Sequence, residues 1–124
     1  MKWDEILMNN KLFDIDLSGS TWCTALFHGN HMYCANWGDS RAIIVSQGDK
    51  EEELIVKVAS RDHKPDESDE AERIVNGNGR IESFQDYNGE PIGPLRVWLK
   101  YEDLPGLAMT RSMGDGWAQK AGVI

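Results

Sequence analysis

The sequence predicts an α+β fold that is built mainly from antiparallel strands and contains one or two helices. Two dipeptides, Gly29-Asn30 and Gly38-Asp39, each separate two apolar runs. Such pairs are typical of tight hairpin turns because glycine accepts the positive φ that these turns need. A later run, Leu54–Ala59, is rich in β-branched residues, which favour strands. Together these observations predict an antiparallel sheet region of about four to six strands.

The first expected unit is a three-stranded meander with strands at Thr21–His28, His31–Trp37 and Ser40–Ser46. If both turns contain two residues, Cys34 lies opposite Ile43 on the neighbouring strand. One face of the meander is then almost wholly apolar, and the residues that share it are Cys23, Ala25, Phe27, Met32, Cys34, Ile43 and Val45. The opposite face also carries large apolar side chains. We therefore expect other layers of a domain to cover both faces and to bury this set.

The second turn of the meander places Asp39 at the tip of a loop, beside Ser40 and Arg41. A carboxylate held at the rim of a rigid sheet can bind a cation or a phosphate-bearing partner. Another acidic segment, residues 47–53, contains three glutamates. A solvated hairpin loop explains that segment better than a cation site does.

A helix is expected at Asp69–Asn76, with Asp66 or Ser68 as its N-cap and Gly77 at its C′ position. His63, shortly before it, could act as a general base. The neighbouring sequence contains no nucleophile or partner acid at a spacing that would indicate catalysis by His63. We therefore interpret His63 as part of a shaped turn and expect it to bond to the backbone.

From residue 77 to residue 105 the chain is rich in glycine and proline, which predicts an irregular segment with short strands at Arg80–Phe84 and Leu95–Trp98. Long irregular segments in compact domains are usually functional. Within it, Arg96, Trp98 and Tyr101 could contact a peptide, because aromatic residues and arginine dominate binding hot spots. A packed local cluster is an equally good interpretation of these three residues.

The last part of the sequence predicts a strand at Leu107–Arg111 and a short helix at Gly114–Gly122, with Trp117 and Ala118 facing inward. The chain stops at an apolar, uncapped end, and it also starts abruptly. From these ends we expect an excised or incomplete domain.

Composition excludes some classes of function. The formal net charge is −8, which argues against a nucleic-acid partner because phosphate backbones demand a basic surface. The sequence has no apolar run of about 18 residues, so it predicts no membrane-spanning helix. Cys23 and Cys34 lie diagonally on one face of the first hairpin and are interpreted as reduced thiols, which favours a cytoplasmic or nuclear location.

Several short segments resemble those of the metal-dependent protein serine/threonine phosphatases of the 2C type, and they occur in the order found in that family. They are Ser18–Thr21 (SGST), Gly38–Arg41 (GDSR), Asp62–Pro65 (DHKP), Glu72–Ile74 (ERI) with Gly79–Ile81 (GRI), Arg96–Trp98 (RVW) and Gly106–Asp115 (GLAMTRSMGD). Together they extend over nearly the whole chain.

This resemblance implies a partial α/β/β/α sandwich with antiparallel sheets, incomplete at both ends. Residues 1–124 would be the central part of the phosphatase domain, and residues 77–105 would be the flap subdomain that helps to choose substrates. The implied activity is hydrolysis of phosphoserine and phosphothreonine in phosphoprotein substrates. That chemistry uses two Mg²⁺ or Mn²⁺ ions that activate a bridging water.

The family's main metal-binding carboxylates come from DGHGG, DG-x-WD and DN segments, which this chain lacks. Asp115-Gly116-Trp117 looks like the second of these but matches the end of the RS-x-GD segment. By resemblance, Asp39 matches the position of a third, weaker metal ion. We therefore expect no catalytic residue within this chain, and little or no metal binding and no activity from the chain alone. By the same resemblance, Arg96, Trp98 and Tyr101 would be substrate-binding residues of the flap.

Two other functions stay open at this point. A pseudophosphatase or scaffold domain would keep the fold and bind proteins without catalysis. A small β-rich acidic binding module, complete as it stands, would owe nothing to the phosphatase family.

Overall fold

The structure is a computed structural model that describes residues 5–7, 9–12, 14–50 and 52–124, and it has an α+β fold in which every paired strand is antiparallel. The strands are β1 (Gly19–Ser20), β2 (Trp22–His28), β3 (His31–Trp37), β4 (Ile43–Gln47), β5 (Leu54–Val58), β6 (Gly79–Gln85), β7 (Pro91–Leu99), β8 (Pro105–Leu107) and β9 (Met113–Gly114). The helices are α2 (Ser68–Asn76) and α3 (Gly116–Gln119), and residues 5–7 form a helical turn. Within the described ranges, no helix has the length and apolar character needed to cross a membrane.

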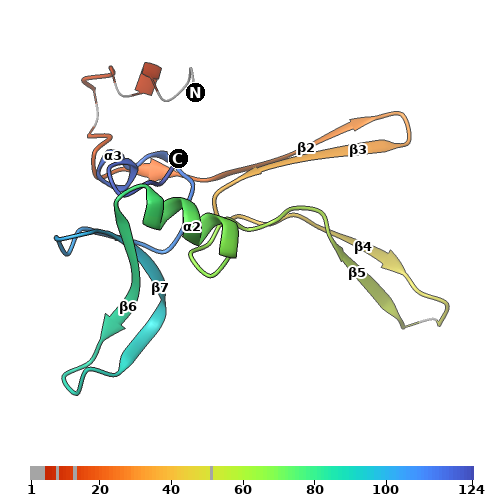
Figure 1. Cartoon of the computed structure of the whole chain (residues 1–124). Coiled ribbons are helices and arrows are strands. Elements are labelled where there is room, and N and C mark those ends of the chain that lie inside the picture. The colour runs from red at the N-terminus through yellow and green to blue at the C-terminus, as the bar shows by residue number, and fades with distance from the viewer. Residues whose placement is uncertain (1–4, 8, 13, 51) are drawn as a thin grey trace.

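Within the described residues the strands form four small sheets, in the pairings β1–β9, β2–β3, β4–β5 and β6–β7–β8. The β2–β3 and β4–β5 hairpins project from the centre of the molecule as two separate arms, which we call the hairpin arms (Figure 1). The β6–β7 hairpin extends in another direction, and α2 and α3 lie near the point where these units meet.

The first predicted turn and its register are confirmed. Strands β2 and β3 pair with Phe27 opposite Met32 and with Ala25 opposite Cys34. Gly29 has a φ of +57°, the positive value that a tight turn requires. Both cysteines of this hairpin are free.

The predicted pairing across the second turn is wrong. Strand β4 pairs with β5, so that Ile43 lies opposite Val58 and not opposite Cys34. Gly38 has a φ of +102°, but the chain after it does not fold back along β3. The expected three-stranded meander therefore does not form. Its first two strands are the β2–β3 arm, and its third strand is β4 of the β4–β5 arm.

Side-chain contacts explain why the chain leaves β3 at this point. The Oγ1 atom of Thr21 and the Oγ atom of Ser40 are hydrogen-bonded at 2.6 Å. The Ala42 N–H donates to Ser60 Oγ at 2.8 Å, and Arg41 donates to both carboxylate oxygens of Asp62. These partners occupy residues 40–42, which the hairpin would have needed as a paired strand.

The expected burial of the apolar face is also wrong for most of its residues, and on that face only Met32 and Cys34 of β3 are partly buried. Phe27 is 72% exposed and Ile43 is 54% exposed, and every residue of β2, β4 and β5 is exposed. Burial requires a second layer, and no described residue packs over the hairpin arms as such a layer.

The hydrophobic core is small and lies where α2, β7 and α3 meet. Its members are Ile74, Val97, Leu99, Ala118, Ala121 and Val123, with Ile81, Leu107 and Trp117 packed against them. The segment that the sequence predicted to be irregular is in fact a long hairpin, β6–β7, whose base is part of this core. Both predicted strands of that segment exist and are longer than expected, since cross-strand pairing continues past the glycines.

Helix α2 is confirmed, but its predicted caps are wrong. Its N-cap residue is Glu67, and no side chain of a described residue makes a capping hydrogen bond there. Gly77 has a φ of −85°, and the left-handed residue is Asn78. A Cβ on Gly77 would lie 2.8 Å from the Cα of Gly122, so the glycine is needed for close packing between two backbones.

The end of the chain is less regular than predicted. The strand expected at Leu107–Arg111 is wrong apart from its first residue, because β8 ends at Leu107. The helix expected at Gly114–Gly122 is limited to the four-residue α3. Gly114 pairs with Gly19 of β1 instead of entering the helix. As predicted, Ala118 is buried, whereas Trp117 is only partly buried.

Candidate functional site

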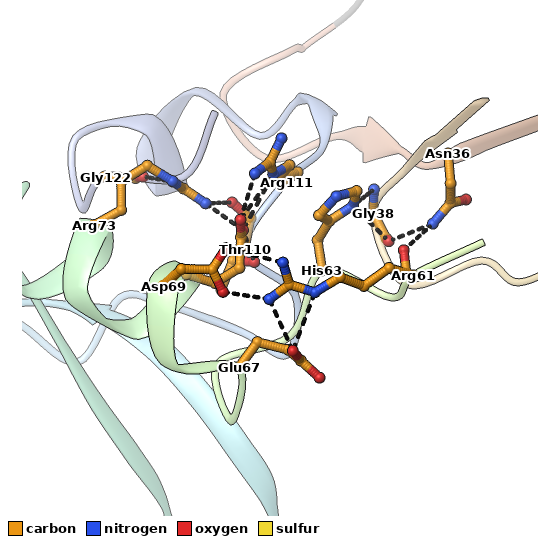
Figure 2. Close-up of polar contacts among 11 residues, drawn as sticks. Asn36, Gly38, Arg61, His63, Glu67, Asp69, Arg73, Thr110, Arg111 and Gly122 are labelled. Carbon is orange, nitrogen blue, oxygen red and sulfur yellow. Dashed lines mark hydrogen bonds and ion pairs between the residues drawn. The ribbon is translucent and has the colours of Figure 1, made fainter.

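The turn that carries Asp39 is anchored to the loop before α2. The backbone N–H of His63 donates to the carbonyl of Gly38 at 2.9 Å, and the Gly38 N–H lies 3.2 Å from Nδ1 of His63 (Figure 2). This confirms the interpretation of His63 as a backbone-bonded residue of a shaped turn. Burial and the nearby charge of Arg111 lower the pKa of His63, which favours the neutral imidazole that can accept from Gly38.

A buried carboxylate lies behind this turn, and sequence reasoning missed it. Glu70 of α2 is only 1% exposed, and Thr110 donates to its Oε2 at 2.5 Å. Arg111 and Arg73 both form ion pairs with it. Burial alone would raise the pKa of Glu70, but the hydrogen bonds from Arg111 and Thr110 outweigh it and lower the pKa to about 2.

The sequence contains a signal that could have located Glu70. Glu70 precedes Ile74 by four residues, so both side chains lie on the same face of α2. Since Ile74 is the buried anchor of that helix, its face is also the one on which burial of the acid could be expected, and a buried carboxylate needs cationic partners. The partner Arg111 follows far later in the chain, so only the fold brings the two together.

The same arginines connect Glu70 to the Asp39 turn. The guanidinium of Arg111 lies 5.2 Å from the ring centroid of Trp37, the residue before Gly38. Arg73 donates to the carbonyl of Thr110 at 3.0 Å, and it also donates to the carbonyl of Gly122. The turn, α2 and the 110–112 segment are therefore held together as one unit (Figure 2).

Two further ion-pair groups stiffen the loop before α2. Arg61 donates to the carboxylates of Glu67 and Asp69, and its carbonyl accepts from Asn36 Nδ2 at 2.8 Å. Asp62 pairs with Arg41 at 2.7 Å and with Lys64 at 3.2 Å. The hydrogen bonds from Arg41 outweigh the effect of burial and lower the pKa of Asp62, so this carboxylate is ionised at neutral pH.

Asp39 itself lines a pocket of about 380 Å³. The other lining residues are Lys64, Pro65, Asp66, Pro94, Leu95 and Ala108. They come from the β3–β4 turn, the loop before α2, strand β7 and the segment after β8. Within the described part of the chain, no group of three histidine, cysteine or acidic residues could hold a metal ion. The lining carries two carboxylates, Asp39 and Asp66.

The three candidate flap residues do not share one surface. Trp98 is 6% exposed, and its Nε1–H donates to the carbonyl of Glu82 at 2.9 Å. Arg96 donates to the carbonyl of Gly106 at 2.7 Å and lies over the ring of Phe84, which also contacts Trp98 edge-on. Tyr101, by contrast, is 86% exposed. The structure thus packs Arg96 and Trp98 as a local cluster, and a role in substrate binding stays a prediction for all three.

Comparison with known proteins supports the family resemblance that the short sequence segments indicated. The family described as Protein phosphatase 2C matches residues 3–123 of this chain. Probable protein phosphatase 2C 52 of Arabidopsis thaliana is 42% identical over 98% of this chain and 25% of its own length. Probable protein phosphatase 2C 73 of Oryza sativa subsp. japonica is 40% identical over 98% of this chain and 28% of its own length.

A solved structure supports the same fold. The serine-threonine phosphatase 2C from Toxoplasma gondii superposes with a TM-score of 0.70 at 22% identity, over 98% of this chain and 37% of the other. The chain spans about a quarter of the length of the curated relatives named above. The interpretation as a β-rich module unrelated to the phosphatases is therefore wrong, and this chain belongs to the Protein phosphatase 2C family.

Proposed function

We propose that this chain is the central part of a metal-dependent protein phosphatase that hydrolyses phosphoserine and phosphothreonine in proteins. The observation that carries the proposal is the family match over residues 3–123, in which the GDSR segment forms a rigid turn beside a pocket. The substrates would be phosphoproteins, and the cofactors would be Mg²⁺ or Mn²⁺, which prefer oxygen ligands. The proposed location is cytoplasmic or nuclear.

In this proposal the chain contributes positioning and recognition, and the two catalytic ions are held by carboxylates from outside it. Asp39 would be a ligand of a third, weakly bound ion, since a single carboxylate leaves Mg²⁺ largely hydrated. Residues 77–105, which contain the β6–β7 hairpin, would be the flap that helps to select substrates. When bound, the ions supply an activated water for attack on phosphorus.

The test is a phosphatase assay of the purified 124-residue chain in millimolar Mn²⁺, beside a longer protein that carries the same residues within a full family domain. We expect metal-dependent release of phosphate from phosphopeptides only from the longer protein. If the short chain released phosphate, and Asp39→Asn abolished that activity, the proposal that the catalytic ions are held by carboxylates from outside this chain would be contradicted. A longer protein that binds phosphopeptides without hydrolysing them would instead support the pseudophosphatase function.

A further inference from the structure

The pocket beside Asp39 has walls of two kinds. Pro65, Pro94, Leu95 and Ala108 give it an apolar side, and Asp39, Lys64 and Asp66 give it a polar side. Its volume of about 380 Å³ lies within the range of about 300–1,000 Å³ that is usual for ligand clefts. Because its lining comes from four separate segments, the pocket is a product of the fold and not of one loop.

The polar side of the pocket carries unpaired negative charge. The Lys64 ammonium group is 3.2 Å from Asp62, which is not a lining residue. Among the described residues, none makes a hydrogen bond or ion pair with the carboxylates of Asp39 or Asp66. Arg41 also pairs with Asp62. The pocket and the residues paired with it therefore contain two cationic side chains and three carboxylates, which are Arg41, Lys64, Asp39, Asp62 and Asp66.

This combination fits a long cationic side chain. Lysine and arginine have an aliphatic stem that packs on apolar surface and a charged head that seeks carboxylates. The structure already shows the second half of this pattern on its own surface, where Arg61 donates to Glu67 and Asp69 together. The chain's net charge of −8 also favours the approach of a basic partner.

We propose that this pocket binds a lysine or arginine side chain of a substrate polypeptide. The stem lies against Pro94, Leu95 and Ala108, and the charged head contacts the carboxylates of Asp39 and Asp66. At Asp39 the charged head competes with the weakly bound third ion, and the binding itself needs neither metal ion nor phosphate. That the polypeptide is a substrate rests on the proposed function, and a basic residue near the phosphorylated site would then help to determine which sites are chosen.

The test is an NMR titration of the ¹⁵N-labelled chain with a short, blocked, unphosphorylated alanine–glycine peptide that has one central arginine. Analogues carry lysine, citrulline or norleucine at the same position. We expect the arginine and lysine peptides to shift the backbone amides of Asp39, Leu95 and Ala108, and we expect the two neutral analogues not to do so. Raising the salt concentration should weaken the binding.

Variants separate the pocket from general attraction to an acidic protein. Asp39→Asn and Asp66→Asn should each weaken binding by about three- to tenfold, as expected for a charge-assisted contact at a partly exposed site. The matched control is Asp49→Asn in the exposed β4–β5 turn, which removes the same charge at a residue that does not line the pocket and should leave the affinity nearly unchanged. Neither pocket aspartate makes a side-chain bond with a described residue, so the substitutions should not disturb the fold.

Three results would overturn the inference. They are equal binding of the citrulline and arginine peptides, equal weakening by Asp49→Asn and Asp66→Asn, and binding of Mn²⁺ by both aspartates with no binding of any peptide. Because the titration contains no phosphate and measures no turnover, its failure is distinct from a failure of the phosphatase assay.

Discussion

At the scale of single residues, the most consequential feature is the carboxylate of Glu70. It is buried, and it is the common partner of Arg73, Thr110 and Arg111. These contacts link α2 to the segment that packs against Trp37 at the Asp39 turn. A single side chain therefore holds together elements that are distant in the sequence.

Replacing Glu70 by glutamine should destabilise the protein strongly. The variant leaves two guanidinium groups without their counter-charge, and breaking a buried ion pair in this way usually costs about 3–5 kcal/mol. Urea unfolding at pH 7 measures the loss. The matched control is Glu72→Gln on the exposed side of the same helix, which should change the free energy of unfolding by less than about 0.5 kcal/mol.

The same residue predicts a pH dependence. The folded-state pKa of Glu70, about 2, is below its ordinary value of 4.5, so the unfolded state binds more protons between these values. The stability that Glu70 contributes is thus fully present above pH 4.5 and is lost as the pH falls toward 2. Glu70→Gln should lose less stability than the natural chain over this interval. Parallel curves for the two proteins would contradict the assigned role.

At the scale of elements, the two kinds of hairpin differ in what they contribute. The base of β6–β7 packs into the core through Val97 and Leu99, whereas in the hairpin arms every residue of β2, β4 and β5 is exposed and β3 is at most partly buried. Apolar content alone therefore does not say which hairpin stabilises the molecule. Ile43 of β4 and Ile74 of α2 have the same side chain, but the first is 54% exposed and the second is fully buried.

Truncation of these two isoleucines should separate the elements. Ile74→Ala should lower the free energy of unfolding by about 2–5 kcal/mol, since it removes buried methyl groups and leaves a cavity. Ile43→Ala should cost less than about 1 kcal/mol in this chain, because little of its side chain is removed from water. Chemical denaturation of both variants measures the difference, and equal losses would show that the arm is packed in solution.

At the scale of the whole molecule, the core is small and the exposed apolar surface is large. Phe27, Leu26 and Val58 are each more than 60% exposed on the hairpin arms. Exposed apolar strands with free edges are prone to pair with other chains. The arms are therefore the part of the molecule that most needs a partner layer.

The isolated chain should self-associate as its concentration rises. Sedimentation velocity should show the average mass increasing with concentration, and Val45→Lys on β4 should reduce the effect by placing a charge on the apolar face. Ser46→Lys, the next residue on the other side of the strand, adds the same charge at a polar position and should reduce it less. A single monomeric species at all concentrations would contradict the prediction.

Local patterns by themselves determined much of this protein. Gly29-Asn30 specified the β2–β3 turn and its register. A two-residue turn allows only one pairing of the flanking strands, and that pairing fixes which side chains share each face. The order of the short segments specified the family, and the backbone role of His63 followed from its place in a turn.

Tertiary contacts decided the rest. The chain leaves β3 because Ser40, Arg41 and Ala42 find partners in Thr21, Asp62 and Ser60, which no local pattern relates to one another. Glu70 and Arg111 meet only because α2 packs against the 110–112 segment. The pocket at Asp39 likewise exists only where four distant segments converge. Hairpin registers depend on neighbouring residues, whereas burial, ion-pair partners and pockets depend on which surfaces meet after folding.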